Sequence, residues 1–443
     1  MIEKTNSNTS SDKKPDPKNF LFVSIDALIT DIAWQVVKEG HNVRYYIASK
    51  GEREIGDGFV PKVDNWEAEI EWADVIVFDD VLGQGTKAKK LREQGKSVIG
   101  GTPYTDRLED ERAFGQEELK KAGINVANYG DFTSFDAAID FVKQNPDKYV
   151  LKPSGQAQNI KGLLFIGEED DGRDVIQVLG DYKKAWANKI PSFQLQKRIT
   201  GVEVAVGAFF DGKEFIYPIN VNFEHKKFFP GNLGPSTGEM GTSMFWSDPN
   251  KLFNATLKKF EQKLAEEGYV GYIDINCIVN KNGIYPLEWT TRFGYPTISI
   301  QQEGMAIPIG EFLYDLAKGN KPKLKVKSGF QIGVRIVVPP FPFKDKETFE
   351  VKSKDSVIFF KKPTEGVHIE DVALVNDEWL VSGTSGVVLI VCGVGQTMKQ
   401  AQYQVYSRIK NILIPNMYYR TDIGNRWFED SDKLHNWGYL REV

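Results

Sequence analysis

The first hundred residues alternate short apolar runs with stretches of helical periodicity. The pattern predicts strands at 19–26, 42–48, 74–78 and 96–100, and helices at 29–39 and 86–94. Strands that alternate with helices favour a doubly wound parallel sheet, whose ligands bind at the carboxyl ends of the strands. That rule selects the segments near 24–26 and 79–86. The turn 83–86 could receive an anion on its backbone N–H groups, or form a simple tight turn.

A second unit follows a charged amphipathic helix predicted at 108–122. Its predicted strands lie at 149–152, 161–166, 193–199, 202–210 and 214–219. Amphipathic helices are then predicted at 249–268 and 303–318. Residues 330–395 return to a β-like pattern, and a helix at 398–412 is expected to pack on that sheet. Several domains are therefore predicted, as expected for a chain of 443 residues.

Polar residues alternate with apolar ones along 270–296, and a Lys-Asn-Gly turn divides this stretch at 281–283. The pattern predicts a β-hairpin with one polar face. Two such strands could hold Asp274 and Glu288 across from each other, with Thr290 on the same face. Hard oxygen ligands of this kind suit a magnesium ion that also holds nucleotide phosphates. A hairpin with one solvated face is the alternative.

Composition narrows the class of protein. The chain is 41% hydrophobic and 26% charged, and no apolar run reaches the ~18 residues of a membrane span. A net charge of −5 gives no general attraction to nucleic acid. Cys277 and Cys392 lie in separate apolar runs, which favours a reducing cytoplasm over disulfides or a zinc site. Four histidines do not support a multi-histidine metal centre, and the polar segment 1–18 indicates a disordered tail.

Three further segments carry candidate chemistry. Lys152 and Lys161 flank a glycine-containing loop and could cover a triphosphate, or be surface lysines beside a turn. Residues 196–199, followed by Glu203, would suit backbone contacts to adenine and a carboxylate for the ribose hydroxyls. The glycine-rich stretch 231–242 has backbone that can approach phosphates closely, although a long surface loop is the alternative.

The order of these motifs resembles that of ATP-grasp ligases, and most of all the phosphoribosylamine–glycine ligases, also called glycinamide ribonucleotide synthetases. That family carries Gly-Pro-Asn-Thr-Gly-Gly-Met-Gly in its loop and Glu-Phe-Asn-x-Arg-Phe-Gly-Asp-Pro-Glu on its metal strand. The matching segments are Gly234-Pro-Ser-Thr-Gly-Glu-Met-Gly241 and Glu288-Trp-Thr-Thr-Arg-Phe-Gly294. Tyr419-Arg-Thr-Asp-Ile-Gly424 is similar to the family's closing Tyr-Arg-x-Asp-Ile-Gly pattern. The resemblance runs from about residue 19 to about residue 430.

The resemblance implies a multidomain α/β and α+β protein with an ATP-grasp fold. Its expected parts are a disordered tail (1–18), a doubly wound α/β domain (19–125), an ATP-grasp domain (126–325), a C-terminal α+β domain (326–430) and a tail (431–443). The ATP-grasp domain would comprise a small lobe at about 130–197 and a large lobe at about 198–325.

Carried over residue by residue, the resemblance also implies roles for side chains. The residues expected at the nucleotide are Lys152, Lys161, Ser236, Thr237 and Gly238 at the phosphates, Gln196, Lys197 and Ile199 at adenine, and Glu203 at the ribose. Asp274, Glu288 and Thr290 would hold magnesium, or manganese in its place. Arg292 and Lys226 would act catalytically, Arg292 by neutralising charge on the transferring phosphoryl group.

The implied activity is the ATP-dependent joining of a carboxylate to an amine through an acyl phosphate, as in purine biosynthesis. The expected substrates are ATP, a small glycine-like carboxylic acid and an amine, bound by a monomer or a homodimer. Two departures leave the acceptor open. Residues 23–30 lack the family's Gly-Arg-Glu-His, and Tyr295-Pro296-Thr297 replaces its Asp-Pro-Glu. The alternatives are a ligase for a different acid and amine, and a non-catalytic nucleotide-binding protein.

Overall fold

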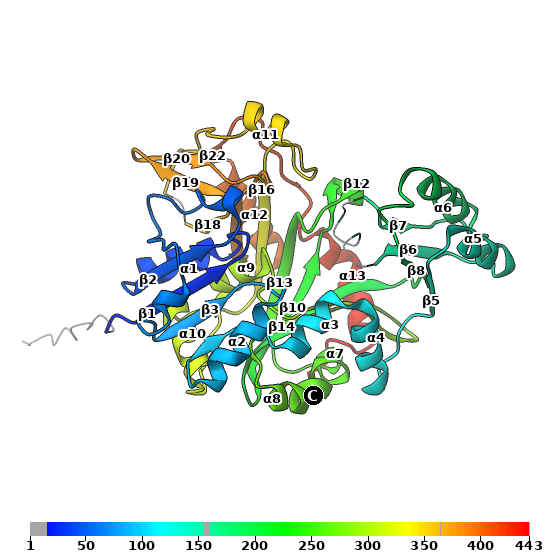
Figure 1. Ribbon diagram of the computed structural model, residues 1–443, viewed down its shortest axis with the longest axis horizontal. Coiled ribbons are helices and arrows are strands. Elements are labelled where there is room, and N and C mark those ends of the chain that lie inside the picture. The colour runs from blue at the N-terminus through cyan, green and yellow to red at the C-terminus, as the bar shows by residue number, and fades with distance from the viewer. Residues whose placement is uncertain (1–15, 155–156, 158–159, 161, 364, 443) are drawn as a thin grey trace, which may run out of the picture.

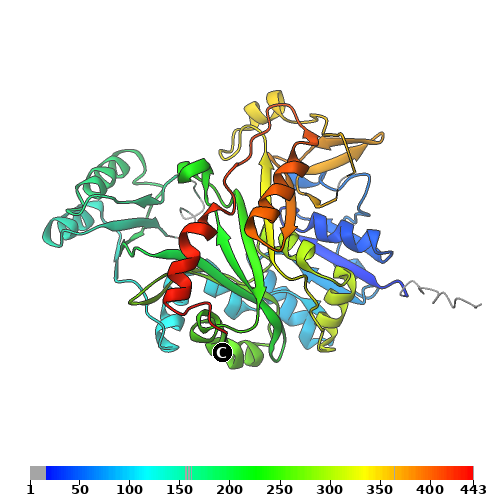
Figure 2. The ribbon, with the colours of Figure 1, turned by 180° about the vertical axis from the view of Figure 1, so that it is seen from behind.

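The computed structural model describes residues 16–442 apart from 155–156, 158–159, 161 and 364. A main body carries a smaller lobe, formed by β5 to β8 with two helices, that projects to one side (Figures 1 and 2). Only residues 16–18 of the predicted N-terminal tail fall within the described part of the chain.

The N-terminal domain is built on a four-stranded parallel sheet with the order β2-β1-β3-β4. Its strands are β1 (Asn19–Ser24), β2 (Asn42–Ile47), β3 (Val75–Phe78) and β4 (Val98–Ile99), with helices α1 (Thr30–Lys38) and α2 (Gln84–Glu93). The predicted parallel α/β sheet is confirmed. Strands β1 and β3 are buried along almost their whole length, which explains their continuous apolar runs.

The region between α2 and the small lobe differs from the prediction. The backbone N–H of Gly85, in the turn offered to an external anion, donates to Asp106 Oδ2 at 3.0 Å. The protein therefore supplies a carboxylate of its own at that turn. The single helix predicted at 108–122 is wrong. Helices α3 (Pro103–Asp110) and α4 (Arg112–Lys121) are separate because Glu111, with φ −106° and ψ 87°, leaves the helical region.

The small lobe has its own sheet and core. Its antiparallel sheet has the order β5-β8-β6-β7, with strands β5 (Tyr129–Phe132), β6 (Tyr149–Pro153), β7 (Phe165–Ile166) and β8 (Phe193–Lys197). Helices α5 (Phe135–Gln144) and α6 (Arg173–Ala185) pack against each other and bury a separate hydrophobic cluster with these strands. The lobe therefore has a hydrophobic core of its own.

The large lobe and the C-terminal domain share one eight-stranded antiparallel sheet, the central sheet, in the order β15-β14-β9-β10-β13-β16-β21-β18. Its strands are β9 (Val202–Asp211), β10 (Phe215–Glu224), β13 (Gly241–Ser247), β14 (Val270–Asn280), β15 (Gly283–Thr290), β16 (Phe330–Val337), β18 (Val367–Ile369) and β21 (Val387–Gly395). Strand β13 pairs with β16 across the domain boundary expected at residue 325. The two predicted domains are therefore joined through backbone hydrogen bonds.

The remaining elements are helices and short strand pairs outside this sheet. The helices are α7 (Lys251–Ala255), α8 (Glu261–Glu267), α9 (Thr297–Gly304), α10 (Ile309–Lys318), α11 (Lys346–Lys352), α12 (Met398–Ile409) and α13 (Asn425–Asn436). Short strand pairs are β11 (Lys227–Phe229) with β12 (Leu233–Ser236), β17 (Phe359–Phe360) with β22 (Ile412–Leu413), and β19 (Val372–Val375) with β20 (Glu378–Val381). Helix α12 packs on β21 and β16, as predicted.

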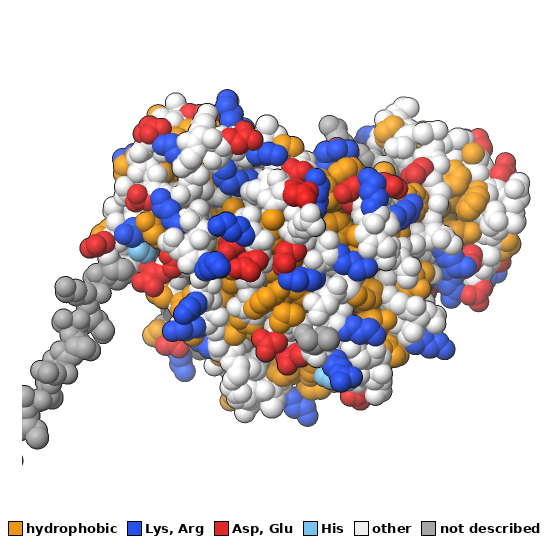
Figure 3. All heavy atoms as spheres, turned by 90° about the horizontal axis from the view of Figure 1, so that it is seen from below, with side chains coloured by type: hydrophobic (Ala, Val, Ile, Leu, Met, Phe, Trp, Pro, Cys, Tyr) orange, Lys and Arg blue, Asp and Glu red, His pale blue; other side chains and the backbone are white. Residues whose placement is uncertain are grey.

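The surface mixes charges of both signs. Lys and Arg side chains are interspersed with Asp and Glu on the face seen from below, with apolar side chains between them (Figure 3). Within the described residues, no helix combines the length and the apolarity needed to cross a membrane.

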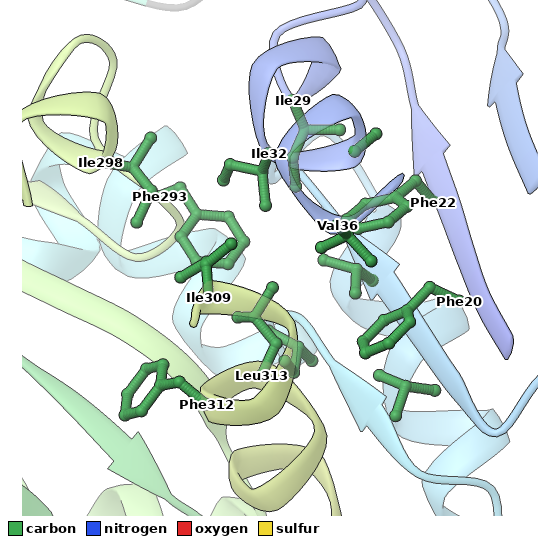
Figure 4. Packing of buried hydrophobic residues seen from close by; sticks show 14 of the residues in the cluster. Phe20, Phe22, Ile29, Ile32, Val36, Phe293, Ile298, Ile309, Phe312 and Leu313 are labelled. Atoms are coloured by element: carbon green, nitrogen blue, oxygen red, sulfur yellow. The ribbon is translucent and has the colours of Figure 1, made fainter. Parts of the chain in front are cut away.

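A shared hydrophobic core holds the N-terminal domain against the large lobe. Side chains from β1 and α1 face side chains from the segment around α9 and α10 (Figure 4). The labelled residues are Phe20, Phe22, Ile29, Ile32 and Val36 on one side and Phe293, Ile298, Ile309, Phe312 and Leu313 on the other. All ten are almost fully buried. Removing this apolar area from water stabilises the junction by roughly 25 cal/mol per Å².

The C-terminal end is part of the core, so the tail predicted at 431–443 is wrong as far as residue 442. Helix α13 lies against the central sheet (Figure 2). Leu434, Tyr439 and Leu440 are buried in the same cluster as β9 and β14, and Glu442 forms a β-bridge with Asn250. The apolar positions of this segment are few and separated by charged residues, which hides their periodicity in the sequence.

Candidate active site

One face of the central sheet carries polar side chains on four adjacent strands. Glu203 lies in β9, Glu224 ends β10, Asn276 lies in β14 and Glu288 in β15. Asn276 pairs with Glu288 on one side and with a residue of β9 two positions from Glu203 on the other. Side chains two residues apart on a strand share a face, so the four polar groups point the same way.

Lys226 follows β10 and places its ammonium among three carboxylates. Its Nζ lies 3.2 Å from Glu203 Oε1 and 3.3 Å from Glu224 Oε2, and it donates to Glu288 Oε1. Asn276 Nδ2 donates to Glu203 Oε1 at 2.9 Å and to Glu224 Oε2 at 3.2 Å. The Glu288 side chain is 56% exposed and that of Glu224 14%, so this Lys226 cluster opens to solvent on the side of β15.

Lys226, Glu203 and Glu288 keep one another ionised, whereas burial raises the pKa of Glu224 above its ordinary value. The Lys226 ammonium holds the pKa of Glu288 at about 2. Burial acts to raise the pKa of Glu203, but Lys226 and Arg426 keep it below its ordinary value. Burial acts to lower the pKa of Lys226, yet the three carboxylates raise it well above its ordinary value. Lys226, Glu203 and Glu288 therefore present fixed charges at neutral pH.

The predicted hairpin forms, but its register differs. Strands β14 and β15 pair Asp274 with Thr290 and Asn276 with Glu288, so the expected opposition of Asp274 and Glu288 is wrong. Asp274 is 3% exposed, and its Oδ1 finds no hydrogen-bond partner among the described atoms. Burial, followed by the charge of Glu224, raises the pKa of Asp274 well above its ordinary value. The three predicted metal ligands therefore lie on one face of the hairpin, with Thr290 opposite Asp274 and Glu288 two residues before Thr290 on β15.

Lys152 lies near the end of β6 in the small lobe and is 8% exposed. Burial and the nearby Arg112 lower its pKa to about 8, while Glu288 acts in the opposite direction. Arg112 also donates to the carbonyl of Pro153 at 2.9 Å, which fixes the end of the strand. Lys152 therefore belongs to the same charged region as the Lys226 cluster. The other predicted phosphate lysine, Lys161, lies outside the described residues.

The predicted adenine segment runs between the two lobes. Gln196 is buried in β8, and the side chain of Lys197 pairs with Asp147 on the small lobe, away from the Lys226 cluster. Arg198 donates its backbone N–H to the carbonyl of Lys148 at 2.8 Å. The backbone N–H of Ile199 donates to no atom in the described part of the chain. A donor for a base is therefore present at Ile199.

The glycine-rich stretch forms the hairpin β11–β12 and the turn that follows it. The backbone N–H and the hydroxyl of Thr237 both donate to the carbonyl of Lys226, each at 2.8 Å. Ser236 pairs with Lys227 in the hairpin. A Cβ added at Gly238 would meet no atom within 4 Å. Thr237 therefore orients Lys226, and Gly238 faces open space.

The C-terminal motif anchors this hairpin. Arg420 is fully buried, pairs with Asp422 at 2.6 Å and donates to the carbonyl of Lys227 at 2.8 Å. Asp422 in turn accepts the backbone N–H of Gly231 at 2.9 Å. Gly231 has a φ of +73°, a conformation that glycine adopts without strain. The Tyr-Arg-Thr-Asp-Ile-Gly segment therefore fixes the base of the glycine-rich hairpin.

Arg292 does not join the Lys226 cluster. Its Nε lies 3.0 Å from Asp80 Oδ1, and its Nη2 lies 3.1 Å from Glu109 Oε1. Both carboxylates belong to the N-terminal domain, and the ring of Tyr295 lies beneath the guanidinium at 5.6 Å. The contact of Arg292 with a transferring phosphoryl group stays a prediction. Arg292 instead lies at the carboxyl end of β3, among acidic side chains that we call the acidic corner (Asp79, Asp80, Glu109).

Two domain families match the chain. The ATP-grasp (A) domain of phosphoribosylglycinamide synthetase matches residues 110–298, and the C domain of the same synthetase matches residues 333–426. The first match contains the Lys226 cluster and Lys152, and the second contains Arg420 and Asp422. The chain belongs to the ATP-grasp ligases of the phosphoribosylglycinamide synthetase type.

Sequence relatives of this ATP-grasp ligase include two bacterial phosphoribosylamine–glycine ligases. That of Lactococcus lactis is 25% identical over 340 residues, which cover 74% of this chain and 78% of the relative. That of Streptococcus pneumoniae is 25% identical over 360 residues, which cover 79% and 82%. The identity is uniformly low, so it supports the ligase class more firmly than the substrates.

Solved structures confirm the ATP-grasp fold. A phosphoribosylamine–glycine ligase from Thermotoga maritima matches with a TM-score of 0.69 at 20% identity, covering 91% of this chain and 100% of that chain. A biotin carboxylase from Campylobacter jejuni matches with a TM-score of 0.62 at 15% identity, covering 96% and 98%. The predicted ATP-grasp fold is therefore confirmed.

The donor set of the ligase fits a divalent cation held with a nucleotide. The carboxylates of Glu203, Glu224 and Glu288 provide hard oxygens, and Asn276 Oδ1 is buried without a hydrogen-bond partner among the described residues. No three His, Cys, Asp or Glu side chains of the described chain converge in metal-binding geometry. The carboxylates are spaced around the Lys226 ammonium, and nucleotide phosphates would complete the oxygen ligands of an ion at this place.

Lys152 leads to a prediction for pH. We expect the affinity for a non-hydrolysable ATP analogue to stay level below about pH 8 and then to fall by up to about tenfold per pH unit. The protonated ammonium attracts the phosphates, and bound phosphates raise its pKa above the value in the free protein. Binding therefore takes up a proton when the pH exceeds about 8. Calorimetric titration at several pH values measures this dependence.

Two variants test whether Lys152 causes that pH dependence. Lys152→Arg should flatten it, because a guanidinium stays ionised throughout this range. Lys183→Ala removes an exposed lysine paired with Asp136 on the far side of the small lobe and should leave the profile unchanged. If the affinity of the wild-type protein does not fall above pH 8, Lys152 does not contact the phosphates.

Sequence reasoning missed Glu224, Asn276 and Arg426 as site residues. Glu224 and Asn276 had a local signal, because each alternates with apolar residues on a strand that carries another polar residue two positions away. Arg426 had none. It donates to backbone carbonyls more than 200 residues away in the chain, and only the tertiary structure brings these groups together.

Proposed function

We propose that this chain is a magnesium-dependent phosphoribosylamine–glycine ligase, which uses ATP to join glycine to an amine through an acyl phosphate. Manganese is expected to replace magnesium. The observation that carries the proposal is the Lys226 cluster, in which one ammonium and three carboxylates meet beside the buried Lys152. Fixed charges of both signs at one place suit a nucleotide that carries a cation on its phosphates.

The residues of the site would divide the work as follows. Glu203, Glu224, Glu288 and Asn276 would hold the metal, which supplies positive charge to the phosphate oxygens when bound. Lys152 and Lys226 would neutralise the phosphoryl group as it moves to the carboxylate, which must be phosphorylated because oxide is a poor leaving group. The amine then attacks the acyl carbon and phosphate departs. The anchored hairpin β11–β12 would shield the acyl phosphate from water.

A ligase that uses a different amine is the second candidate, and the acidic corner favours it. Asp79 is fully buried and accepts from Ser24, and burial followed by the charge of Asp80 raises its pKa to about 7. Asp80 and Glu109 both pair with Arg292, so two carboxylates face one guanidinium. The corner lies at the carboxyl ends of the N-terminal strands, where such sheets bind ligands. Its negative charge suits an amine cation better than a sugar phosphate.

One assay separates these candidates. The protein is incubated with ATP, magnesium and pairs of acids and amines, and phosphate release is followed. Release that requires glycine with phosphoribosylamine supports the proposal. Release with an unphosphorylated amine instead supports the second candidate. If an ATP analogue binds but no pair in the panel releases phosphate, a non-catalytic nucleotide-binding protein replaces both.

A further inference from the structure

The β9–β10 ladder ends next to two carboxylates of the Lys226 cluster. The last registered pair of this ladder at the cluster end is Ala205 with Asn222. Two pairs further on, the antiparallel register would bring Glu203 opposite Glu224, but the ladder ends before that pair. Both residues carry side chains of the cluster, so their separation sets the distance between two of its three carboxylates.

Arg426 bridges the two strands where they part. Its Nη1 donates to the carbonyl of Glu224 at 2.7 Å, and its Nη2 donates to the carbonyl of Glu203. The planar guanidinium offers both donors at a fixed spacing, which a lysine ammonium does not. The Arg426 side chain is only 14% exposed, and Asp430 one turn later on α13 lies 3.5 Å from its Nε. The guanidinium of Arg426 is therefore held by the two backbone carbonyls on one side and by Asp430 on the other.

Helix α13 delivers this guanidinium from a firmly anchored position. The ring of Trp427 packs against Phe223, Phe245 and Phe330, with centroids 5.6, 5.3 and 4.9 Å away. Gln402 of α12 donates to the carbonyl of Ile423 and to Asn425 at the start of α13. Because helix α13 is rigidly held, it can set the spacing between the backbones of β9 and β10.

We propose that Arg426 is a positioning residue of the ligase, which sets the spacing of the Glu203 and Glu224 carboxylates and thereby the geometry of the ATP site. This inference rests on the proposed use of ATP, but on neither of the proposed amines. The C-terminal domain thus completes the nucleotide site from behind the sheet. The same segment holds the glycine-rich hairpin through Arg420 and Asp422, so residues 420–426 control two parts of one site.

The positive charge of Arg426 also affects the groups around Lys226. It helps to keep Glu203 ionised beside Lys226. Together with burial, it lowers the pKa of the adjacent His225 to about 3, so this buried imidazole adds no positive charge to the cluster. Loss of the guanidinium would therefore alter both the spacing and the charge balance around Lys226.

The test compares Arg426→Ala with Arg426→Lys and with Lys433→Ala. Lys433 is the matched control, because it is a cation on the same helix that pairs with Asp430 at 3.3 Å and touches neither strand. For Arg426→Ala we expect the dissociation constant of a non-hydrolysable ATP analogue to rise about thirtyfold, and kcat to fall about as much, because small misplacements in a site are costly. Arg426→Lys should lie in between, and Lys433→Ala should match wild type.

Chemical rescue separates positioning from a merely structural role. Guanidinium chloride at about 10 mM, far below denaturing concentrations, should restore part of the analogue affinity and turnover of Arg426→Ala at an unchanged melting temperature. Loss of function that follows a lowered melting temperature and resists rescue would overturn the proposal, as would unaltered analogue binding in Arg426→Ala. Analogue binding is measured without any amine, so a wrong amine in the proposed function leaves this test intact.

Discussion

Replacing Glu288 by glutamine is expected to lower ATP-dependent phosphate release by about a thousandfold with every acid and amine that supports the wild-type reaction. Glutamine keeps the shape of the side chain but loses the negative charge. Glu288 accepts a hydrogen bond from the Lys226 ammonium, which holds the pKa of Glu288 at about 2, so this carboxylate stays ionised at any working pH. Its exposure to solvent leaves it accessible to an ion that arrives with a nucleotide.

The measurement is steady-state phosphate release, with the magnesium dependence of ATP-analogue binding recorded in parallel. For Glu288→Gln, magnesium should no longer strengthen analogue binding, whereas binding without magnesium should change little. Glu267→Gln serves as the control, because Glu267 pairs with Lys89 and Lys263 away from the site. Full activity in Glu288→Gln would show that the hairpin β14–β15 has no part in the mechanism.

Replacing Lys226 by alanine is expected to lower kcat by about a hundredfold and to destabilise the protein. Without its ammonium, Glu203, Glu224 and Glu288 repel one another across a few ångströms. Lys226 is itself only 30% exposed, and we expect a loss of stability of about 2 kcal/mol, less than for a fully buried ion pair. Magnesium should recover part of this loss, because a divalent cation among the same carboxylates can replace the missing charge.

Melting temperatures with and without magnesium chloride measure that recovery. Magnesium should raise the melting temperature of Lys226→Ala more than that of wild type. Lys227→Ala is the matched control, because the adjacent lysine contributes its backbone to the glycine-rich hairpin and no ion pair to the cluster. Equal magnesium effects in all three proteins would show that the cluster does not bind the ion.

The site is distributed over the whole molecule. The small lobe contributes Lys152, and the large lobe contributes Lys226 and its carboxylates. The C-terminal domain holds the glycine-rich hairpin and the backbone carbonyls of Glu203 and Glu224. The N-terminal domain contributes the acidic corner through Asp80 and Glu109. Catalysis in such a site depends on relative placement, which explains why residues that touch no ligand are expected to affect ATP binding.

Elements with strong local periodicity were predictable from the sequence. Strands β1 to β4 and helix α1 follow apolar patterns that the structure reproduces within a few residues, because burial on both faces of the sheet requires continuous apolar runs. The hairpin β14–β15 was predicted from alternation and a turn, but its register was not. A bulge between Asn276 and Cys277 and the shared ladder with β9 determine which residues meet.

The family and several of the charged residues at the site could be inferred from the chain alone, since they depend on residue types at local spacings. The folded structure was needed to show that Arg292 pairs with Asp80 and Glu109 and that the C-terminal segment is core instead of tail. It was also needed to show that Arg426 bridges the strands of Glu203 and Glu224. These contacts join residues far apart in the chain. Side-chain geometry selects such partners only after the sheets have formed, so no local pattern encodes them.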